Sequence, residues 1–254
     1  PPPLTPPSPT LFPDTTLVRS GVEKKGGGPE IRSTPDAAAP AGAAAPAGAP
    51  GAWVPNKKKV LLIGGGSSHD FQKWYNEVDS ATLQGAGFST RYTEDVTEAT
   101  ALIGEADTVV YSTNQGPFGG LGFQAALRRA TDAGAGLVLL HAGLWYNFAD
   151  NQEYNRVFAG GGSRGHDSIQ EFVVKISDGT HPVTAGLGGG FAVVDELYYS
   201  VLDPAGSPSQ VLATATSPRT GKTFPSIWTV KHDTAKIAAI AAGHDARAHE
   251  LPAF

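Results

Sequence analysis

The stretch GLVLLHAGL, residues Gly136–Leu144, decides the fold that this sequence predicts. Its apolar run Leu137–Leu140 has no polar alternation, which is typical of a strand buried on both faces of a parallel sheet. The run stops at His141, and the small residues Ala142 and Gly143 behind it indicate a tight turn. Ligands of open α/β sheets bind outside the carboxyl ends of the strands. We therefore expect chemistry at His141, the alternative being a histidine that is satisfied by backbone hydrogen bonds.

Strand and helix patterns alternate on the amino-terminal side of this stretch. Repeats of this kind require right-handed crossovers, so they predict a parallel sheet with helices on both faces. The strands are expected at Val60–Ile63, Phe88–Tyr92 and Thr108–Tyr111, and the helices at Phe71–Gly85, Val96–Ile103 and Leu121–Ala133. Further strands are expected at Glu171–Ile176, Phe191–Val194, Val211–Ala215, Ser226–Val230 and Ile237–Ala241.

Residues 1–56 differ in composition from the rest of the chain. Pro1–Pro13 is rich in proline, and Ala37–Ala52 consists almost wholly of alanine, proline and glycine. Such a segment cannot bury enough apolar surface to offset the entropy of ordering, so we predict a disordered tail. Within it, Thr10–Ser20 is more similar to a translated sequencing adapter than to protein, which marks residues 1–20 as a candidate artefact. The folded domain is expected over residues 57–254.

The composition excludes several functional classes. The formal net charge of −5 provides no basic field for nucleic acid. No apolar run approaches the length of a transmembrane helix. The absence of cysteine excludes disulfides, thiolate ligands and a cysteine nucleophile. No signal peptide is visible, and the sequence leaves the compartment open between cytoplasmic and exported.

Most of the seven histidines lie where a strand or turn meets glycine, proline or an acidic residue. Histidine and carboxylate together are ligands for zinc, manganese or iron, and they also provide acid–base groups near neutral pH. We therefore interpret His141, His166 and His244 as residues of one pocket, either catalytic or metal-binding. No pair has the H-x-x-x-H or H-E-x-x-H spacing, so the sequence leaves metal binding open.

Carboxylates accompany these histidines. Asp195 and Glu196 end an apolar strand, and we predict a catalytic role for both, the alternative being turn carboxylates on a solvated face. Asp245 directly follows His244, where it is a candidate for substrate binding or for orienting the imidazole.

Other candidates for substrate binding come from the first glycine turn and from aromatic residues. His69 and Asp70 follow the turn Gly64–Gly66, and Asp70 is also a plausible helix N-cap. Aromatic rings offer apolar area on which a sugar can stack. We predict that role for Trp145, Tyr198 and Trp228, the alternative for each being an ordinary core aromatic.

Several blocks taken together resemble the ThuA-like (trehalose utilisation) family. They are VLLIGGGSSHDF, LLHAGL, GGGSRGHD, HPVTAGL, DELY and GHD, which follow the order of the family from about Lys57 to the end of the chain. The resemblance implies an α/β fold like that of class I glutamine amidotransferases, a flavodoxin-like three-layer sandwich with a mostly parallel central sheet. It also implies that the domain is truncated at its C-terminus, since family members usually continue with a short closing helix.

The resemblance also bears on the chemistry. Glutamine amidotransferases carry a cysteine at the turn where this chain has His141–Ala142, so glutaminase chemistry by thiolate attack is excluded. The family is linked to trehalose and related glycosides through 3-keto-sugar intermediates. Carried over block by block, the resemblance implies site residues at His69, His141, His166, Asp195, Glu196, His244 and Asp245.

Two functions follow as hypotheses. The first is an enzyme that acts on a glycoside or 3-keto-sugar by elimination, hydrolysis or isomerisation, with histidine and carboxylate acid–base chemistry and with or without a divalent metal. The alternative is a non-catalytic carbohydrate-binding module of a larger exported protein. Convergence of His141, His166, His244 and Glu196 would favour the enzyme. Hydrolysis of an amide by metal-held water and the oligomeric state stay open at this point.

Overall fold

A computed structural model describes residues 52–148 and 152–254 of the chain. Most of the predicted disordered tail, residues 1–51, lies outside the described residues. The indole nitrogen Nε1 of Trp53 donates to Glu105 Oε2 at 2.7 Å, and the amide of Val54 donates to Ser89 Oγ at 2.8 Å. The chain therefore contacts the domain already ahead of the expected start at Lys57.

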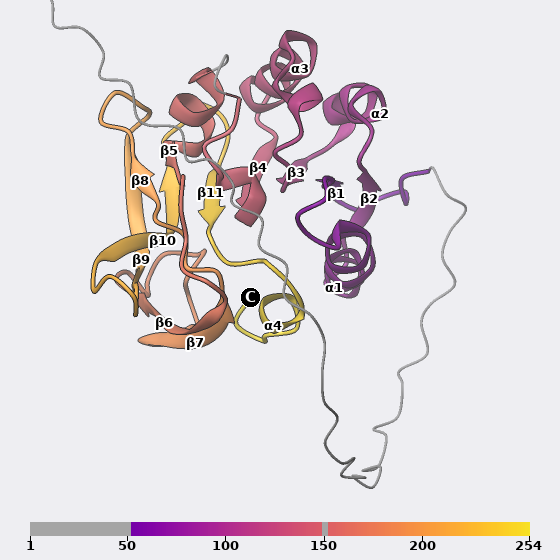
Figure 1. Cartoon of the computed structure of the whole chain (residues 1–254). Helices are drawn as coiled ribbons and strands as arrows, with labels where there is room; N and C mark the ends of the chain where they lie inside the picture. Colours follow the sequence, from indigo (N-terminus) through magenta and orange to yellow (C-terminus); the bar gives the residue numbers. More distant parts are fainter. Residues whose placement is uncertain (1–51, 149–151) are drawn as a thin grey trace, which may run out of the picture. The chain divides into compact units, whose positions relative to one another are not determined.

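A nine-stranded sheet forms the centre of the domain, in the order β2-β1-β3-β4-β11-β10-β9-β6-β7 (Figure 1). Its first five strands are parallel to one another. They are β2 (Ser89–Thr93), β1 (Lys59–Ile63), β3 (Thr108–Tyr111), β4 (Gly136–Leu140) and β11 (Ile237–Ile240). The predicted α/β architecture with a large parallel sheet is confirmed over these strands.

The remaining four strands extend the sheet with antiparallel pairs. They are β10 (Thr223–Val230), β9 (Ser209–Thr216), β6 (Gln170–Ile176) and β7 (Gly190–Asp195). A separate two-stranded sheet pairs β5 (Gly161–Gly162) with β8 (Val201–Leu202). The last strand in sequence, β11, lies between β4 and β10 and so joins the parallel half to the antiparallel half.

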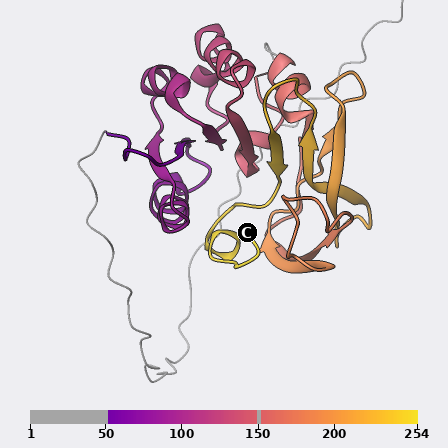
Figure 2. The ribbon, with the colours of Figure 1, turned by 180° about the vertical axis from the view of Figure 1, so that it is seen from behind.

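Helices cover both faces of the parallel half, as Figures 1 and 2 show from opposite sides. Successive strand residues point to opposite faces, so Leu61 packs with the helices on one side and Leu62 with those on the other. One face carries α2 (Val96–Leu102) and α3 (Leu121–Asp132), and the other carries the π-helix η1 (Gln72–Asp79). The shorter helices are α1 (Ser80–Gly85), η2 (Ile103–Glu105), η3 (Gly116–Gly119), η4 (His141–Leu144), η5 (Tyr154–Ala159) and α4 (Ala246–His249).

None of the helices in the described part of the chain combines the length and the apolar character that a bilayer crossing requires.

The antiparallel half has a core of its own, which includes Phe172, Leu212 and Ile227, and α4 closes it with Ala248. Each of the strands β1, β4 and β11 ends on the same edge of the parallel half, because parallel strands share one direction. That edge carries the candidate site.

Candidate functional site

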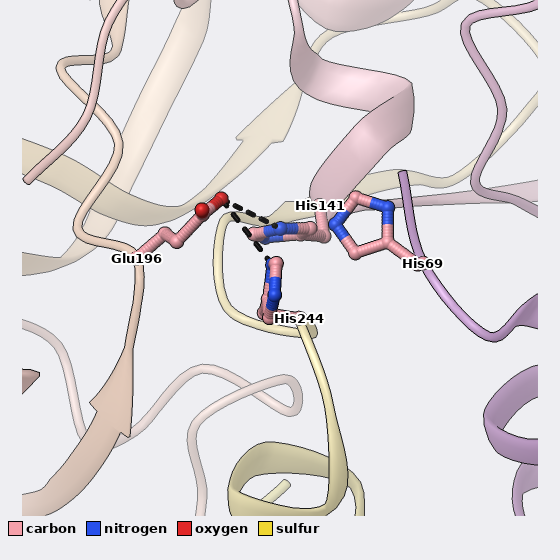
Figure 3. A group of neighbouring side chains, drawn as sticks. All are labelled: His69, His141, Glu196 and His244. Atoms are coloured by element: carbon pink, nitrogen blue, oxygen red, sulfur yellow. Dashed lines mark ion pairs between the residues drawn. The ribbon is translucent and has the colours of Figure 1, made fainter. Parts of the chain in front are cut away.

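Three histidines from the carboxyl ends of parallel strands meet one glutamate (Figure 3). His69 lies in the loop after β1, His141 directly follows β4, and His244 lies in the loop after β11. Glu196 directly follows β7, at the far edge of the antiparallel half. The potential ligand atoms of these residues all lie within 4.8 Å of one another. The site thus forms where open α/β sheets bind their ligands.

The glutamate contacts two of the three imidazoles (Figure 3). Glu196 Oε2 is 3.6 Å from His141 Nε2 and 3.3 Å from His244 Nδ1. The His69 ring contacts the other two imidazoles edge to face, with centroids 4.8 Å from His141 and 4.6 Å from His244. Four side chains that are far apart in sequence therefore converge on one small volume.

His141 has a strained backbone and a fixed tautomer. Its φ of 35° lies in the left-handed region, which is uncommon for a residue with a side chain and is often associated with function. Its Nδ1 lies 2.8 Å from the carbonyl oxygen of Ala241, and a carbonyl only accepts, so Nδ1 carries the proton. The other ring nitrogen, Nε2, faces Glu196. The side chain is fully buried.

Three imidazole nitrogens in this cluster are buried without a hydrogen-bond partner. They are His69 Nε2, His141 Nε2 and His244 Nδ1. Buried polar atoms are nearly always paired, so a group of unpaired nitrogens that share one volume calls for an explanation. Nitrogens of this kind beside a carboxylate are the donors that bind zinc, manganese or iron.

The cluster shifts the pKa values of its members. Partial burial alone would raise the pKa of Glu196, but the neighbouring imidazoles of His141, His244 and His166 outweigh it and hold the pKa well below its usual range. Burial, together with the nearby His141 and His244, lowers the pKa of His69 to about 3. The contact with Glu196 raises the pKa of His244. The carboxylate is thus ionised and His69 is neutral at neutral pH.

His166 lies on the other side of Glu196 and outside the four-residue cluster. Its Nδ1 is 3.5 Å from Glu196 Oε1 and 2.9 Å from the carbonyl oxygen of Asp167, to which it donates. About a third of its side chain is exposed, at 35 %. Of the histidines predicted as metal ligands, His141 and His244 are in the cluster. His69, predicted for substrate binding, takes the place of His166 there.

Asp195 does not face the cluster, which corrects its predicted catalytic role. The residue is buried, and its carboxylate accepts from backbone amides only. Its Oδ1 is 2.6 Å from the amide of Glu196, and its Oδ2 is 2.7 Å from the amide of Gly243 and 3.3 Å from that of His244. Asp195 therefore holds together the two backbone segments that carry Glu196 and His244.

A family model described as trehalose utilisation matches residues 59–254 of the chain. The chain belongs to the ThuA family. Membership in this family suggests a role related to carbohydrates. Among curated proteins, none matches the sequence.

Two solved structures of ThuA-like proteins share the fold of this ThuA chain. A ThuA-like protein from Parabacteroides merdae ATCC 43184 has a TM-score of 0.65 and 22% identity, covering 74% of this chain and 80% of that one. A second, from Bacteroides uniformis ATCC 8492, has a TM-score of 0.63 and 18% identity, with 79% and 88% covered. The glutaminase domain of Trypanosoma brucei CTPS has a TM-score of 0.42 and 12% identity, with 73% and 85% covered.

Two of the predicted aromatic residues adjoin the site of this ThuA protein, and one does not. The Tyr198 ring lies 4.4 Å from that of His141, and the half-buried Trp145 ring lies 5.8 Å from that of His166. Trp228 is 0% exposed in the main core, where its Nε1 donates to the carbonyl oxygen of Ala159 at 2.8 Å. Trp228 therefore cannot stack on a sugar, which corrects that prediction.

Two predicted carboxylates cap helices instead of facing the cluster. Asp70 Oδ1 accepts from the amide of Lys73 at 3.1 Å, as a helix N-cap does. Asp245 Oδ1 accepts from the amide of Arg247 at 3.0 Å, and its carboxylate also pairs with the guanidinium of Arg247. Arg247 thus engages both carboxylate oxygens of Asp245, whereas the Asp70 side chain is exposed and accepts at Oδ1 alone, and the predicted substrate contacts of both residues stay predictions.

Proposed function

We propose that this ThuA protein is an enzyme that acts on a glycoside or 3-keto-sugar by histidine and carboxylate acid–base chemistry, with a divalent metal. One observation carries the proposal. One nitrogen each of His69, His141 and His244 is buried without a hydrogen bond, and the potential ligand atoms of these histidines and of the ionised Glu196 all lie within 4.8 Å of one another. A carbohydrate-binding module needs no such group, so the convergence favours the enzyme over the binding alternative.

The residues of the cluster fit a divalent metal. His69, His141, His244 and Glu196 would hold it, since neutral imidazole and carboxylate are ligands of zinc, manganese and iron. The hydrogen bond from His141 Nδ1 to a backbone carbonyl is the kind that orients metal-binding histidines. When bound, the metal supplies Lewis-acid polarisation of a substrate carbonyl.

His166 is the acid–base group in this proposal. Its Nδ1 proton is held by the carbonyl of Asp167, so the neutral ring has its lone pair on Nε2. A 3-keto group acidifies the adjacent C–H bond. His166 Nε2 takes that proton, the electron pair of the C–H bond forms a C=C bond, and the glycosidic C–O bond breaks. The proton on Nε2 then passes to the leaving oxygen, which regenerates the neutral imidazole, and until then Glu196 stabilises the imidazolium from 3.5 Å.

Paired variants test this division of roles. Wild-type protein, His141→Ala, His166→Ala and His232→Ala are analysed for metal content and for turnover of a 3-keto-glycoside, followed by the absorbance of the enone product. His232 precedes β11 and so lies at the opposite edge of the sheet from the site, which makes it a suitable control.

We expect about one metal ion per wild-type chain. His141→Ala loses metal and turnover, His166→Ala keeps the metal but loses turnover, and His232→Ala keeps both. A wild-type protein that stays metal-free after incubation with zinc, manganese and iron, and that leaves keto-glycosides unchanged, would refute the proposal.

A further inference from the structure

The peptide that precedes His244 is held from both sides. Gly243 has a φ of 134°, and a Cβ added there would lie 3.1 Å from the Cβ of His141. The His244 amide, which is the N–H of this peptide, donates to Asp195 Oδ2 at 3.3 Å, and the amide of Gly243 itself donates to the same oxygen at 2.7 Å. The carbonyl oxygen of Gly243 accepts from the hydroxyl of Tyr75 at 2.8 Å and contacts Nε2 of His249 at 3.0 Å. These bonds fix the orientation of the peptide from which the His244 side chain projects.

The imidazole of His249 is itself held by Asp79. His249 Nδ1 lies 2.8 Å from Asp79 Oδ1, and the His249 side chain is fully buried. A carbonyl only accepts, so the contact with Gly243 requires a proton on Nε2. The pair then has one further proton between Nδ1 and Oδ1. Asp79 thus keeps His249 in the state that donates to the Gly243 carbonyl.

Aromatic neighbours lock the plane of this imidazole. Trp74 stacks on it with centroids 6.1 Å apart, while Tyr75 and Phe254 contact it edge to face at 4.7 Å and 4.9 Å. Asp79 is the last residue of η1, the helix that follows the loop of His69. The Asp79–His249 pair therefore connects the segment that provides His69 to the segment that provides His244.

We propose that Asp79, His249 and Tyr75 are positioning residues, which act through the Gly243 carbonyl to fix the His244 imidazole. This inference rests on the proposed function for its importance, because His244 is one of the proposed metal ligands. None of the three residues is itself a member of the cluster that faces Glu196. Tyr75 and His249 contact the carbonyl oxygen of Gly243, whereas Asp195 accepts from the amides of Gly243 and His244.

The variants separate hydrogen bonding from packing. His249→Phe keeps a ring among Trp74, Tyr75 and Phe254 but removes the donor. His249→Gln keeps an amide donor but removes the ring. Tyr75→Phe removes only a hydroxyl, and so tests the same carbonyl if the His249 variants fail to fold. His232→Phe is the matched control, since His232 also pairs with a carboxylate, Asp132, at 3.6 Å, far from the site.

Two measurements on the full chain give the readouts. The first is hydrogen exchange of the Gly243 and His244 amides in metal-free protein, both of which donate to Asp195. We expect exchange at least about tenfold faster in His249→Phe and Tyr75→Phe, with partial recovery in His249→Gln and no change in His232→Phe. The second is the dissociation constant for Co²⁺ from its visible absorption, which we expect to rise about ten- to a hundredfold in His249→Phe.

The outcomes distinguish this inference from the proposed function. Unchanged amide exchange in His249→Phe and Tyr75→Phe overturns the positioning role, even if wild-type protein binds Co²⁺. Faster exchange in both variants supports the positioning role, whether or not wild-type protein binds metal. If wild-type protein binds no metal, only the metal in the proposed function is refuted. Faster exchange in His232→Phe to the same extent would show a general loss of stability and would also overturn the positioning role.

Discussion

Glu196 places a negative charge beside three imidazoles of the site, those of His141, His166 and His244. Replacement by glutamine keeps the shape and removes the charge. We predict that Glu196→Gln weakens metal binding by more than about a hundredfold, since even residues behind a metal ligand contribute ten- to a hundredfold. Competition with a chromophoric chelator measures the change. Asp132→Asn, which removes a carboxylate charge beside His232 at the opposite edge of the sheet, is the control, and equal affinities in Glu196→Gln and wild type would contradict the prediction.

Asp167 gives a prediction about acid stability. Burial would raise the pKa of this fully buried carboxyl, but hydrogen bonds from Tyr199, Ser217 and Arg219 outweigh it and lower the pKa. A lowered pKa stabilises the folded state above the usual aspartate pKa, and this stabilisation is lost as the pH falls through the lowered value.

Removal of one donor should therefore matter more at neutral pH than in acid. We predict that Tyr199→Phe lowers the free energy of unfolding by about 1.5–3 kcal/mol at about pH 7, the usual range for a hydrogen bond to a charged group. The loss should shrink in acid, at a pH below the usual aspartate pKa, as the pH falls through the lowered pKa of Asp167. Urea unfolding at both pH values measures it, and an equal loss at both would show that the hydroxyl does not act through the charge of Asp167.

At the scale of elements, the turn after β4 needs glycine at one position. A Cβ at Gly143 would lie 2.6 Å from the carbonyl oxygen of Tyr111, which is backbone and cannot move aside. We predict that Gly143→Ala lowers the free energy of unfolding by about 1–3 kcal/mol. Gly122 in α3 has open space around it, so Gly122→Ala should raise stability by about 0.4–1 kcal/mol. Chemical denaturation of both variants provides the comparison, and equal effects would contradict the account of the turn.

The strands could be predicted because their cause is local. Leu137–Leu140 and Val60–Ile63 are continuous apolar runs, and such runs are typical of strands that are buried on both faces. The place of His141 at the end of β4 followed from the same run. The antiparallel order of β6, β7, β9 and β10 could not be predicted, because alternating strands of this kind carry no signal of which neighbour they join.

The membership of the site was harder to predict than its location. His166 and His69 each follow a glycine-rich turn, and only the path of the loops decides which one reaches His141. Trp228 was misjudged because a core aromatic and a sugar-stacking aromatic have the same residue type. Asp79 and His249 had no distinguishing pattern, since they are 170 residues apart in the sequence and the other partner of His249 is a backbone carbonyl.

At the scale of the whole molecule, the proposed metal joins both halves of the sheet. Its ligands follow β1, β4, β7 and β11, so the binding site exists only in the folded domain. A ligand that binds only the folded state stabilises it by about 2.7 kcal/mol at a concentration a hundred times its dissociation constant. We therefore predict that zinc raises the melting temperature and that a chelator reverses the change. His166→Ala should retain this response and His141→Ala should lose it, and a response retained by His141→Ala would place the metal elsewhere.

The central place of β11 has a consequence for biosynthesis. The strand lies between β4 and β10, yet it is made after every other strand. While the ribosome is still making residues 141–236, β4 has an unpaired edge, and such edges invite association with other chains. Until β11 has been made, this edge can pair with other chains. The proposed site can be complete only after β11 has been made, since the loop with His244 follows that strand.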